Sequence, residues 1–257
     1  MTKYPVILVH GIALKDFRFL RAFGAIENVL KAEGHTVYTG KTDGFGTVEN
    51  NAVQLKAQIT RILIKHGAEK VNIIAHSKGG LDAKYMIKFL GMEQRVASLT
   101  TLCTPHKGAQ LASLILRLPL AVKKFIAFWV DLCYRIFGDK HPDSLAVCNQ
   151  LKAYNSNENT SGFSDNVYCQ SYSTAMERGR DDLIMSVPFM ITKRLESAKS
   201  DGLVSEESSK FGEYKGAAAD GSISHSEIVD FMVKKKKRSR IYGFYIRLCS
   251  DLADRGF

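Results

Sequence analysis

Short runs of apolar residues alternate along the chain with longer stretches whose apolar positions recur at helical spacing. The runs predict strands at residues 5–9, 35–38, 70–75, 95–103 and 166–172. The helical spacing predicts helices at residues 19–34, 47–66, 81–90 and 241–252. Strands and helices that alternate in this way form a mostly parallel sheet with helices on both faces. The expected fold class is therefore α/β.

Polar and small residues follow three of the predicted strands directly. His10-Gly11 ends the first run, Ser77 follows the strand at 70–75, and Thr104-Pro105-His106 follows the strand at 95–103. Ligands of parallel sheets gather at the carboxyl ends of the strands. We therefore expect these three segments to meet at one edge of the sheet.

Ser77 stands between a predicted strand and a predicted helix, with Ala75 two residues before it and Gly79 two residues after it. A nucleophile held on a strained strand-to-helix turn needs small residues at these two places, because the two backbones almost touch. The same position also suits a serine that only caps the helix. The pattern alone leaves both interpretations open.

Gly11 follows a core strand, where a glycine lets the backbone turn sharply and present the next N–H to a neighbouring site. In acyl transfer, two such N–H groups stabilise the oxyanion. The donors expected here are the backbone N–H groups of Ile12 and Lys78. An ordinary strand-to-loop glycine is the alternative.

Three motifs carry a resemblance to a known family: Val9-His10-Gly11-Ile12, Ala75-His76-Ser77-Lys78-Gly79-Gly80 and Thr104-Pro105-His106-Lys107-Gly108. They resemble the landmarks of bacterial triacylglycerol lipases of the α/β-hydrolase superfamily. The similarity runs from about residue 4 to 110 and resumes near Ser200. It implies an α/β-hydrolase fold with a helical lid insertion, and ester hydrolysis through a Ser-His-Asp triad. Lys78 departs from the neutral residue usual in such lipases, but only its backbone N–H is required.

The remaining members of the implied triad should follow Ser77 in the order acid, then histidine. Asp201-Gly202-Leu203-Val204 resembles the acid loop of the family, and Ser224-His225-Ser226 resembles the loop that carries its histidine. His225 would transfer the Ser77 proton while Asp201 orients the imidazole ring. Asp201-Gly202 is also a good turn pair, and His225 could simply open a helix. The rival acids are Asp181, Asp182 and Asp220, and the rival base is His141.

The segment at about 109–150 is unusually apolar but is interrupted too often to span a membrane. Its place after a sheet strand suits a lid or cap over an acyl-binding cleft, within a single domain of residues 1–257. Leu114, Phe125 and Trp129 are the expected substrate-binding residues. A plain pair of core helices is the alternative interpretation.

Net charge and cysteine content narrow the function classes. The 257-residue chain carries a net charge of +10, which favours anionic partners. Its five cysteines include no Cys-x-x-Cys pair, which argues against a disulfide framework or a zinc site and suits a reducing compartment. We expect no cofactor, no metal, no nucleic acid and no transmembrane segment; a structural calcium held by Asp181, Asp182 and Glu227 is the alternative. The chain opens without a signal peptide, so a cytoplasmic protein is favoured over a secreted one.

Residues 234–240 form a basic run that is expected to follow a helix from 227 to about 234. Cations at a helix C-terminus are ordinary dipole partners. Transient contact with a lipid interface through the lid segment and this basic run is also expected, and the run would favour an anionic surface. His76 is expected to point away from Ser77 and to have a structural role. The sequence thus predicts a carboxylic-ester hydrolase, and specifically a lipase acting on acylglycerols. The alternatives are an esterase of short soluble esters, polyesters or thioesters, and a non-catalytic protein that binds lipid or an anionic partner.

Overall fold

A computed structural model describes residues 1–12, 21–153, 166–195 and 198–257. Its centre is a six-stranded sheet in the order β2-β1-β3-β4-β5-β6, with every neighbouring pair parallel. The strands are β1 (Val6–Val9), β2 (Val37–Thr39), β3 (Val71–His76), β4 (Val96–Leu102), β5 (Tyr168–Ser173) and β6 (Glu213–Ala217). The strand order reverses between β1 and β3, which makes the carboxyl ends of these two strands the expected binding edge.

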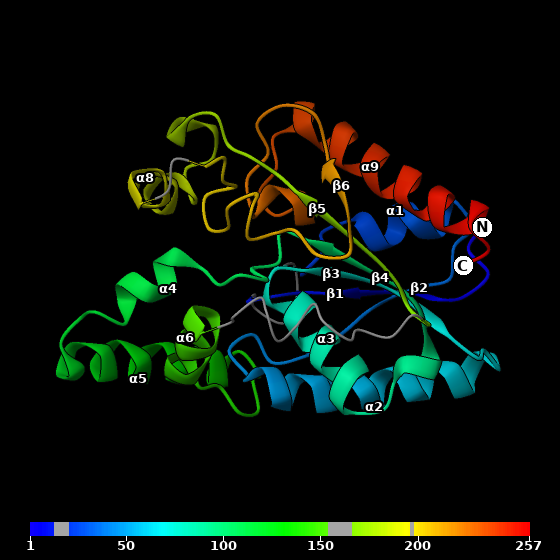
Figure 1. Ribbon diagram of the computed structural model, residues 1–257, viewed down its shortest axis with the longest axis horizontal. Coiled ribbons are helices and arrows are strands. Elements are labelled where there is room, and N and C mark those ends of the chain that lie inside the picture. The colour runs from blue at the N-terminus through cyan, green and yellow to red at the C-terminus, as the bar shows by residue number, and fades with distance from the viewer. Residues whose placement is uncertain (13–20, 154–165, 196–197) are drawn as a thin grey trace.

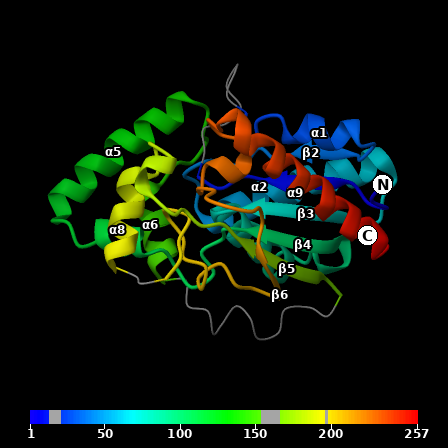
Figure 2. The same cartoon turned by 90° about the horizontal axis from the view of Figure 1, so that it is seen from above.

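Four helices cover the two faces of the sheet: α1 (Ile26–Ala32), α2 (Val48–His66), α3 (Lys78–Phe89) and α9 (Lys235–Asp254). The helices α2 and α3 lie on one face, and α1 and α9 lie on the other (Figure 1). Beyond the carboxyl ends of the strands lie four more helices, α4 (Gln110–Ile115), α5 (Leu120–Ile136), α6 (Ser144–Ala153) and α8 (Ser186–Leu195). Figure 2 shows from above how this second group stands apart from the helices that cover the sheet.

The alternation of side chains along β1 supplies both halves of the core. Val6 and Leu8 pack into the cluster shared with α1 and α9, whereas Ile7 and Val9 pack into the cluster shared with α2 and α3. Successive residues of a strand point to opposite faces, so a strand covered on both sides must be apolar throughout. The unbroken apolar run of β1 follows from this position in the middle of the sheet.

The expected α/β class and mostly parallel sheet are confirmed, but β6 was not foreseen. This edge strand reads Glu-Tyr-Lys-Gly-Ala, and none of its residues is fully buried. An edge strand that is partly exposed to solvent needs no run of apolar residues, so the apolar pattern that predicts central strands is absent here.

The structure corrects the expected placement of the basic run. Only a short 3₁₀ turn, η3 (Glu227–Val229), lies where a helix to about residue 234 was predicted, and the run opens α9 instead of ending a helix. Cations at a helix N-terminus oppose the helix dipole, and nearby acids offset this cost. Lys237 binds both carboxylate oxygens of Glu227, and Arg238 donates to Asp230 over 2.8 Å.

All five cysteines are free thiols, in agreement with the expected absence of a disulfide framework. Within the described parts of the chain, no helix combines the length and the apolar character that crossing a membrane requires.

Candidate active site

The turn between β3 and α3 holds Ser77 in a strained conformation, with φ 55° and ψ −134°. Such backbone angles persist in a non-glycine residue only where the surrounding structure enforces them. Here the enforcement comes from close backbone packing. A Cβ atom on Gly79 would lie 2.4 Å from the carbonyl oxygen of His10, and one on Gly80 would lie 2.2 Å from Oγ1 of Thr104. The small residues seen in the sequence are therefore a steric requirement of this turn.

Three residues far apart in the sequence form one hydrogen-bonded chain at the carboxyl edge of the sheet. Nε2 of His225 lies 2.9 Å from Oγ of Ser77, and Nδ1 of His225 lies 2.6 Å from Oδ2 of Asp201. Asp201 is completely buried, and His225 is almost so. The Ser77 side chain makes no helix-capping hydrogen bond, so its hydroxyl is engaged by the imidazole instead. A serine, an imidazole and a buried carboxylate in this order form the geometry of an activated nucleophile.

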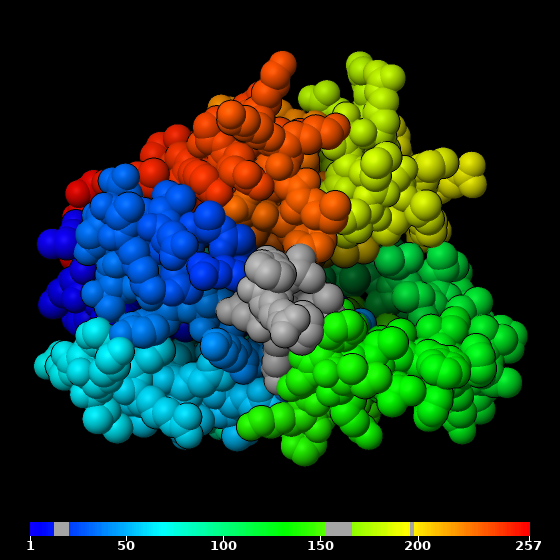
Figure 3. Space-filling view, turned by 180° about the vertical axis from the view of Figure 1, so that it is seen from behind, coloured from blue at the N-terminus to red at the C-terminus, as the bar shows by residue number. Residues whose placement is uncertain are grey.

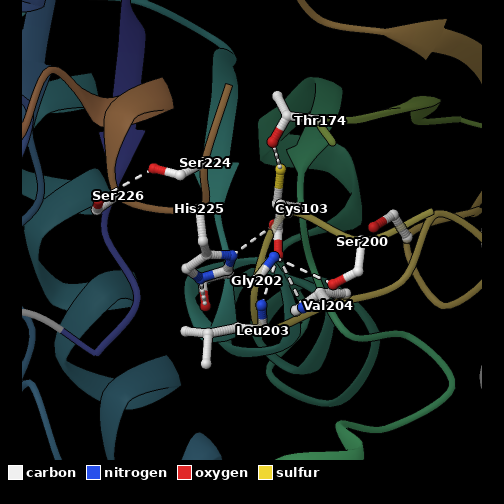
Figure 4. Close-up of polar contacts among 12 residues, drawn as sticks. Cys103, Thr174, Ser200, Gly202, Leu203, Val204, Ser224, His225 and Ser226 are labelled. Carbon is white, nitrogen blue, oxygen red and sulfur yellow. Dashed lines mark hydrogen bonds and ion pairs between the residues drawn. The ribbon is translucent and has the colours of Figure 1, made fainter. Parts of the chain in front are cut away.

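The Asp201 carboxylate is held from two sides. Its Oδ1 accepts hydrogen bonds from the backbone N–H groups of Leu203, at 2.9 Å, and Val204, at 2.8 Å. The N–H of His225 donates to the carbonyl oxygen of Asp201 over 2.9 Å, which ties the two loops together. Figure 4 shows His225 beside this loop, with Cys103 close to both.

Two neighbours of the imidazole were not expected from the sequence. The ring of His76 lies 4.5 Å from that of His225, so His76 packs against the histidine instead of pointing away from the site. Burial lowers the pKa of His76 well below its usual value, and His225 lowers it further. The Cys103 thiol is buried and bonds to the Thr174 hydroxyl; burial and the nearby Asp201 carboxylate raise its pKa. Both neighbours are therefore uncharged at neutral pH.

The turn at Gly11, which precedes the expected oxyanion donor Ile12, packs directly against the turn at Ser77. A Cβ atom on Gly11 would lie 2.6 Å from Cβ of Ser77 and 3.0 Å from the backbone nitrogen of Lys78, so only glycine lets the two turns approach this closely. The Lys78 side chain points elsewhere, because its ammonium group binds the buried Asp82 carboxylate at 2.7 and 2.9 Å. Burial raises the pKa of Asp82 to about 6, against the opposing effect of Lys78.

The rival residues occupy other places. Asp220 and His141 are exposed, and the N–H of His141 donates to Asp43 over 3.0 Å. Asp182 accepts hydrogen bonds from the hydroxyls of both serines that flank His225, Ser224 at 2.5 Å and Ser226 at 2.6 Å. Burial would raise the pKa of Asp182, but these hydroxyls outweigh it and lower the pKa below its usual value. Asp182 therefore braces the histidine loop, a role that the two serines beside His225 could have suggested.

Replacing Asp182 with asparagine is expected to lower kcat about 10-fold or more, because a histidine loop that shifts by a fraction of an ångström misplaces the base. Asp181→Asn is the matched control, since Asp181 accepts from Ser222 and from the Arg178 N–H, outside the immediate flanks of His225. The measurement is kcat for a soluble ester with both variants. Equal losses in the two variants would contradict the bracing role.

A cavity of about 500 Å³ opens beside Ser77 and His225. Apart from the histidines, Ser77, Ser226 and Arg21, its lining is almost entirely apolar; the main contributors beyond the strand edge are Leu111, Ala112, Ile115, Tyr134, Leu151, Ile184, Met185 and Val229. Seen from behind, the surface is hollowed between the segment that carries α4 to α6 and the segment that carries α8 (Figure 3). The helices α4 and α6 thus contribute walls of the cavity.

The three expected substrate-binding residues are not among those that line this cavity. Leu114 is 37%, Phe125 66% and Trp129 51% exposed. Two neighbours of Leu114 on α4, Leu111 and Ile115, line the cavity instead. Apolar spacing indicates that a helix has an apolar side, but not which of its residues meet the cavity.

Cys103, Asp201 and His225 each place one potential metal-ligand atom within 4.8 Å of the others. This group coincides with the hydrogen-bonded chain, and a metal there would compete with the bond between His225 and Asp201. The residues suggested for calcium are engaged otherwise, because Asp182 accepts the serine hydroxyls and Glu227 binds Lys237.

The fold, together with the serine, histidine and aspartate at the carboxyl ends of the strands, is that of a serine hydrolase of the α/β-hydrolase class. A family model described as palmitoyl protein thioesterase matches residues 5–172, and the chain belongs to this family.

Curated relatives support the enzyme class and its carboxylic-ester hydrolase chemistry. The chain is 27% identical over 260 residues to triacylglycerol lipase 2 of Saccharomyces cerevisiae, an alignment that covers 90% of this chain and 73% of that protein. It is 38% identical over 120 residues to triacylglycerol lipases of Pseudarthrobacter phenanthrenivorans and Burkholderia plantarii. These alignments cover 44% of this chain but only 37% and 33% of the two bacterial proteins. The resemblance to bacterial lipases is confirmed, and these relatives support an enzyme over the non-catalytic alternative.

Solved structures support the fold. The mature Bacillus licheniformis lipase BlEst2 superposes with a TM-score of 0.69 at 18% identity, covering 96% of this chain and 92% of that one. The Staphylococcus hyicus lipase superposes with the same TM-score at 16% identity, covering 98% and 95% of the two chains.

Proposed function

We propose that the protein is a lipase that hydrolyses long-chain acyl esters such as acylglycerols, with Ser77, His225 and Asp201 as its catalytic triad. The observation that carries the proposal is the unbroken hydrogen-bonded chain from Asp201 to Ser77, which ends at an apolar cavity. An activated hydroxyl beside an apolar cavity suits a substrate whose carbonyl carries a long hydrocarbon chain.

Acylation begins when Oγ of Ser77 attacks the ester carbonyl carbon while Nε2 of His225 takes the hydroxyl proton. The tetrahedral intermediate collapses as the C–O bond to the alcohol breaks, and His225 gives its proton to the departing oxygen. Water then attacks the acyl-enzyme with His225 again as the base, which releases the acid and restores Ser77. The buried Asp201 carboxylate holds the ring and stabilises the imidazolium that forms in each half-reaction.

The backbone N–H groups of Ile12 and Lys78 would stabilise the oxyanion in both half-reactions. Lys78 begins α3, so its N–H has no partner within the helix and lies at the positive end of the helix dipole. The contact between Gly11 and the Ser77 turn brings the segment with Ile12 to the same place. Preorganised donors of this kind are worth about 10²-fold or more each in kcat.

A thioester substrate is the second candidate, favoured by the family model described as palmitoyl protein thioesterase. The same triad serves both reactions, with a thiol in place of the alcohol as the leaving group. In either case the segment at about 109–150 would act as a cap, because α4 and α6 wall the cavity. A cytoplasmic rather than an exported enzyme stays a prediction.

The test combines a substrate series with active-site labelling. Hydrolysis of p-nitrophenyl esters from acetate to palmitate is expected to show kcat/KM rising about 10-fold or more toward the longer chains, because each buried methylene adds binding energy. An S-palmitoylated peptide tests the thioester under the same conditions. A fluorophosphonate is expected to label Ser77, with Ser77→Ala as the blank.

A preference for acetate over every longer ester would contradict the long-chain proposal while leaving the triad in place. Labelling that persists in Ser77→Ala would contradict the assignment of the nucleophile. Faster cleavage of the palmitoyl thioester than of the oxygen ester would favour the second candidate.

A further inference from the structure

The helix α5 is built with its apolar side outward. None of its residues is fully buried, and its exposed large apolar side chains are 36% to 72% exposed: Leu120, Val122, Phe125, Ile126, Phe128, Trp129, Leu132 and Ile136. Its inward side carries Tyr134, which lines the cavity and packs against Phe45, together with polar groups that bond to the rest of the protein. The ammonium group of Lys123 donates to the carbonyl oxygen of Leu116 over 2.9 Å, and Asp131 accepts from the Ser144 N–H over 2.7 Å. A surface helix of a water-soluble protein normally shows the opposite arrangement.

Polar contacts fasten the end of α5 to the loop that precedes α2. The Asp139 carboxylate accepts from the N–H groups of Gly44 and Phe45, at 3.0 and 2.9 Å. In return, Asp43 accepts from the N–H groups of Lys140 and His141, both at 3.0 Å. Both aspartates are buried. The exposed apolar side is therefore a feature of a fixed helix, and no lid has to open to display it.

The charge around this apolar side has one sign. The acids between residues 117 and 140 are Asp131 and Asp139, and both are turned inward to the bonds just described. Arg117, Lys124 and Arg135 are exposed. An exposed apolar surface with a cationic fringe is complementary to an anionic lipid surface, and like charges disfavour its pairing with a second copy of the same face.

The helix α8, at the same end of the molecule, also has exposed apolar side chains and cations. The segment that carries α8 exposes Leu183, Ile184, Val187 and Met190, and α8 itself contains cations but no acid. Ile184 also lines the cavity beside Ser77. The helices α5 and α8 both lie beyond the carboxyl ends of the strands (Figures 1 and 2).

We propose that the exposed sides of α5 and α8 form a permanent docking surface for an anionic lipid bilayer. The docking would place the cavity mouth against the lipid from which the acyl substrate comes, and this benefit rests on the proposed function. Exposed Phe and Trp side chains would enter the boundary between headgroups and acyl chains, while Lys124 and Arg135 meet the phosphates. Because α5 is already displayed, docking needs no activation step.

The test uses Trp129, the single tryptophan of the chain, as the reporter. Vesicles of phosphatidylcholine containing phosphatidylglycerol are expected to shift its emission to the blue and to co-sediment the protein, with weaker binding to phosphatidylcholine alone. Ile136→Asp is expected to weaken co-sedimentation about 10-fold, because it removes one apolar contact and adds a negative charge. Ile64→Asp is the matched control, since Ile64 lies in the last turn of α2, away from α5 and α8, and is 77% exposed against 72% for Ile136.

Equal losses in Ile136→Asp and Ile64→Asp, or wild-type protein that binds neither vesicle, would overturn the proposal. The Ser77→Ala variant is expected to bind vesicles like the wild type. Binding by that variant therefore tests the docking surface even if the proposed catalytic triad fails its own test.

Discussion

Replacing Asp201 with asparagine is expected to lower kcat for ester hydrolysis about 10⁴-fold with little effect on folding. The asparagine oxygen can still accept the N–H groups of Leu203 and Val204, so the loop retains its backbone contacts. The amide nitrogen would face Nδ1 of His225 as a donor, and the imidazole would then carry its proton on Nε2. A protonated Nε2 cannot accept the proton of Ser77, so the base is lost although the geometry survives.

The measurement is kcat with p-nitrophenyl butyrate, alongside the urea midpoint of each variant. Asp220→Asn is the matched control, because Asp220 is exposed and it is its main-chain carbonyl oxygen that accepts from Arg240. A variant at Asp201 that keeps more than about a tenth of the activity would assign the acid elsewhere, and Asp182 would be the next residue to replace.

Replacing Lys84 with methionine is expected to stabilise the protein at neutral pH by about 2 kcal/mol. Lys84 is 2% exposed; its ammonium nitrogen lies 3.3 Å from Nδ1 of His106 and 4.1 Å from the ring centre of Phe211. Burial lowers the pKa of Lys84 to about 7 from an ordinary 10.5, with Cys169 opposing the shift and Lys88 adding to it. The burial of this amine costs about 4 kcal/mol at pH 7, from which the lost contacts with His106 and Phe211 are subtracted.

The pH dependence follows from the direction of that shift. Between pH 7 and 10.5 the unfolded chain holds the Lys84 proton more fully than the folded protein does, so the contribution of this group to stability rises with pH across the window. The advantage of Lys84→Met should therefore be largest near or below neutrality and should shrink toward alkaline pH. The imidazole of His106, which faces Lys84, does not reverse this trend. Burial lowers the pKa of His106 well below its usual value, and Lys84 lowers it further.

Urea denaturation of wild type and Lys84→Met at several pH values between about 6 and 9 measures the difference. Lys88→Met, one turn further along α3, controls for the loss of a lysine from the same helix. A stability difference that does not change with pH would show that Lys84 keeps its proton in the folded protein.

Local sequence patterns were sufficient wherever a feature depends on residues adjacent in the chain. The apolar runs predicted the strands β1, β3 and β4, because a strand covered on both faces has to be apolar. The small residues around Ser77 indicated the turn, because its backbone contacts exclude any residue larger than glycine at position 79. The edge strand β6 and the start of α9 gave no such signal, since neither is enclosed on all sides.

By itself, the amino-acid sequence determined the α/β class and the strained turn that presents Ser77, because periodicity and steric size act within a few residues. Only the tertiary structure decided which aspartate meets His225, that Asp182 holds the serines beside it, and that α5 faces outward. Those outcomes depend on contacts between segments far apart in the chain, as between Asp43 and His141, which are 98 positions apart. Helical spacing shows that α5 has two unlike sides, but which side meets the solvent is seen only in the structure, where the buried bonds of Asp43 and Asp139 hold the end of the helix.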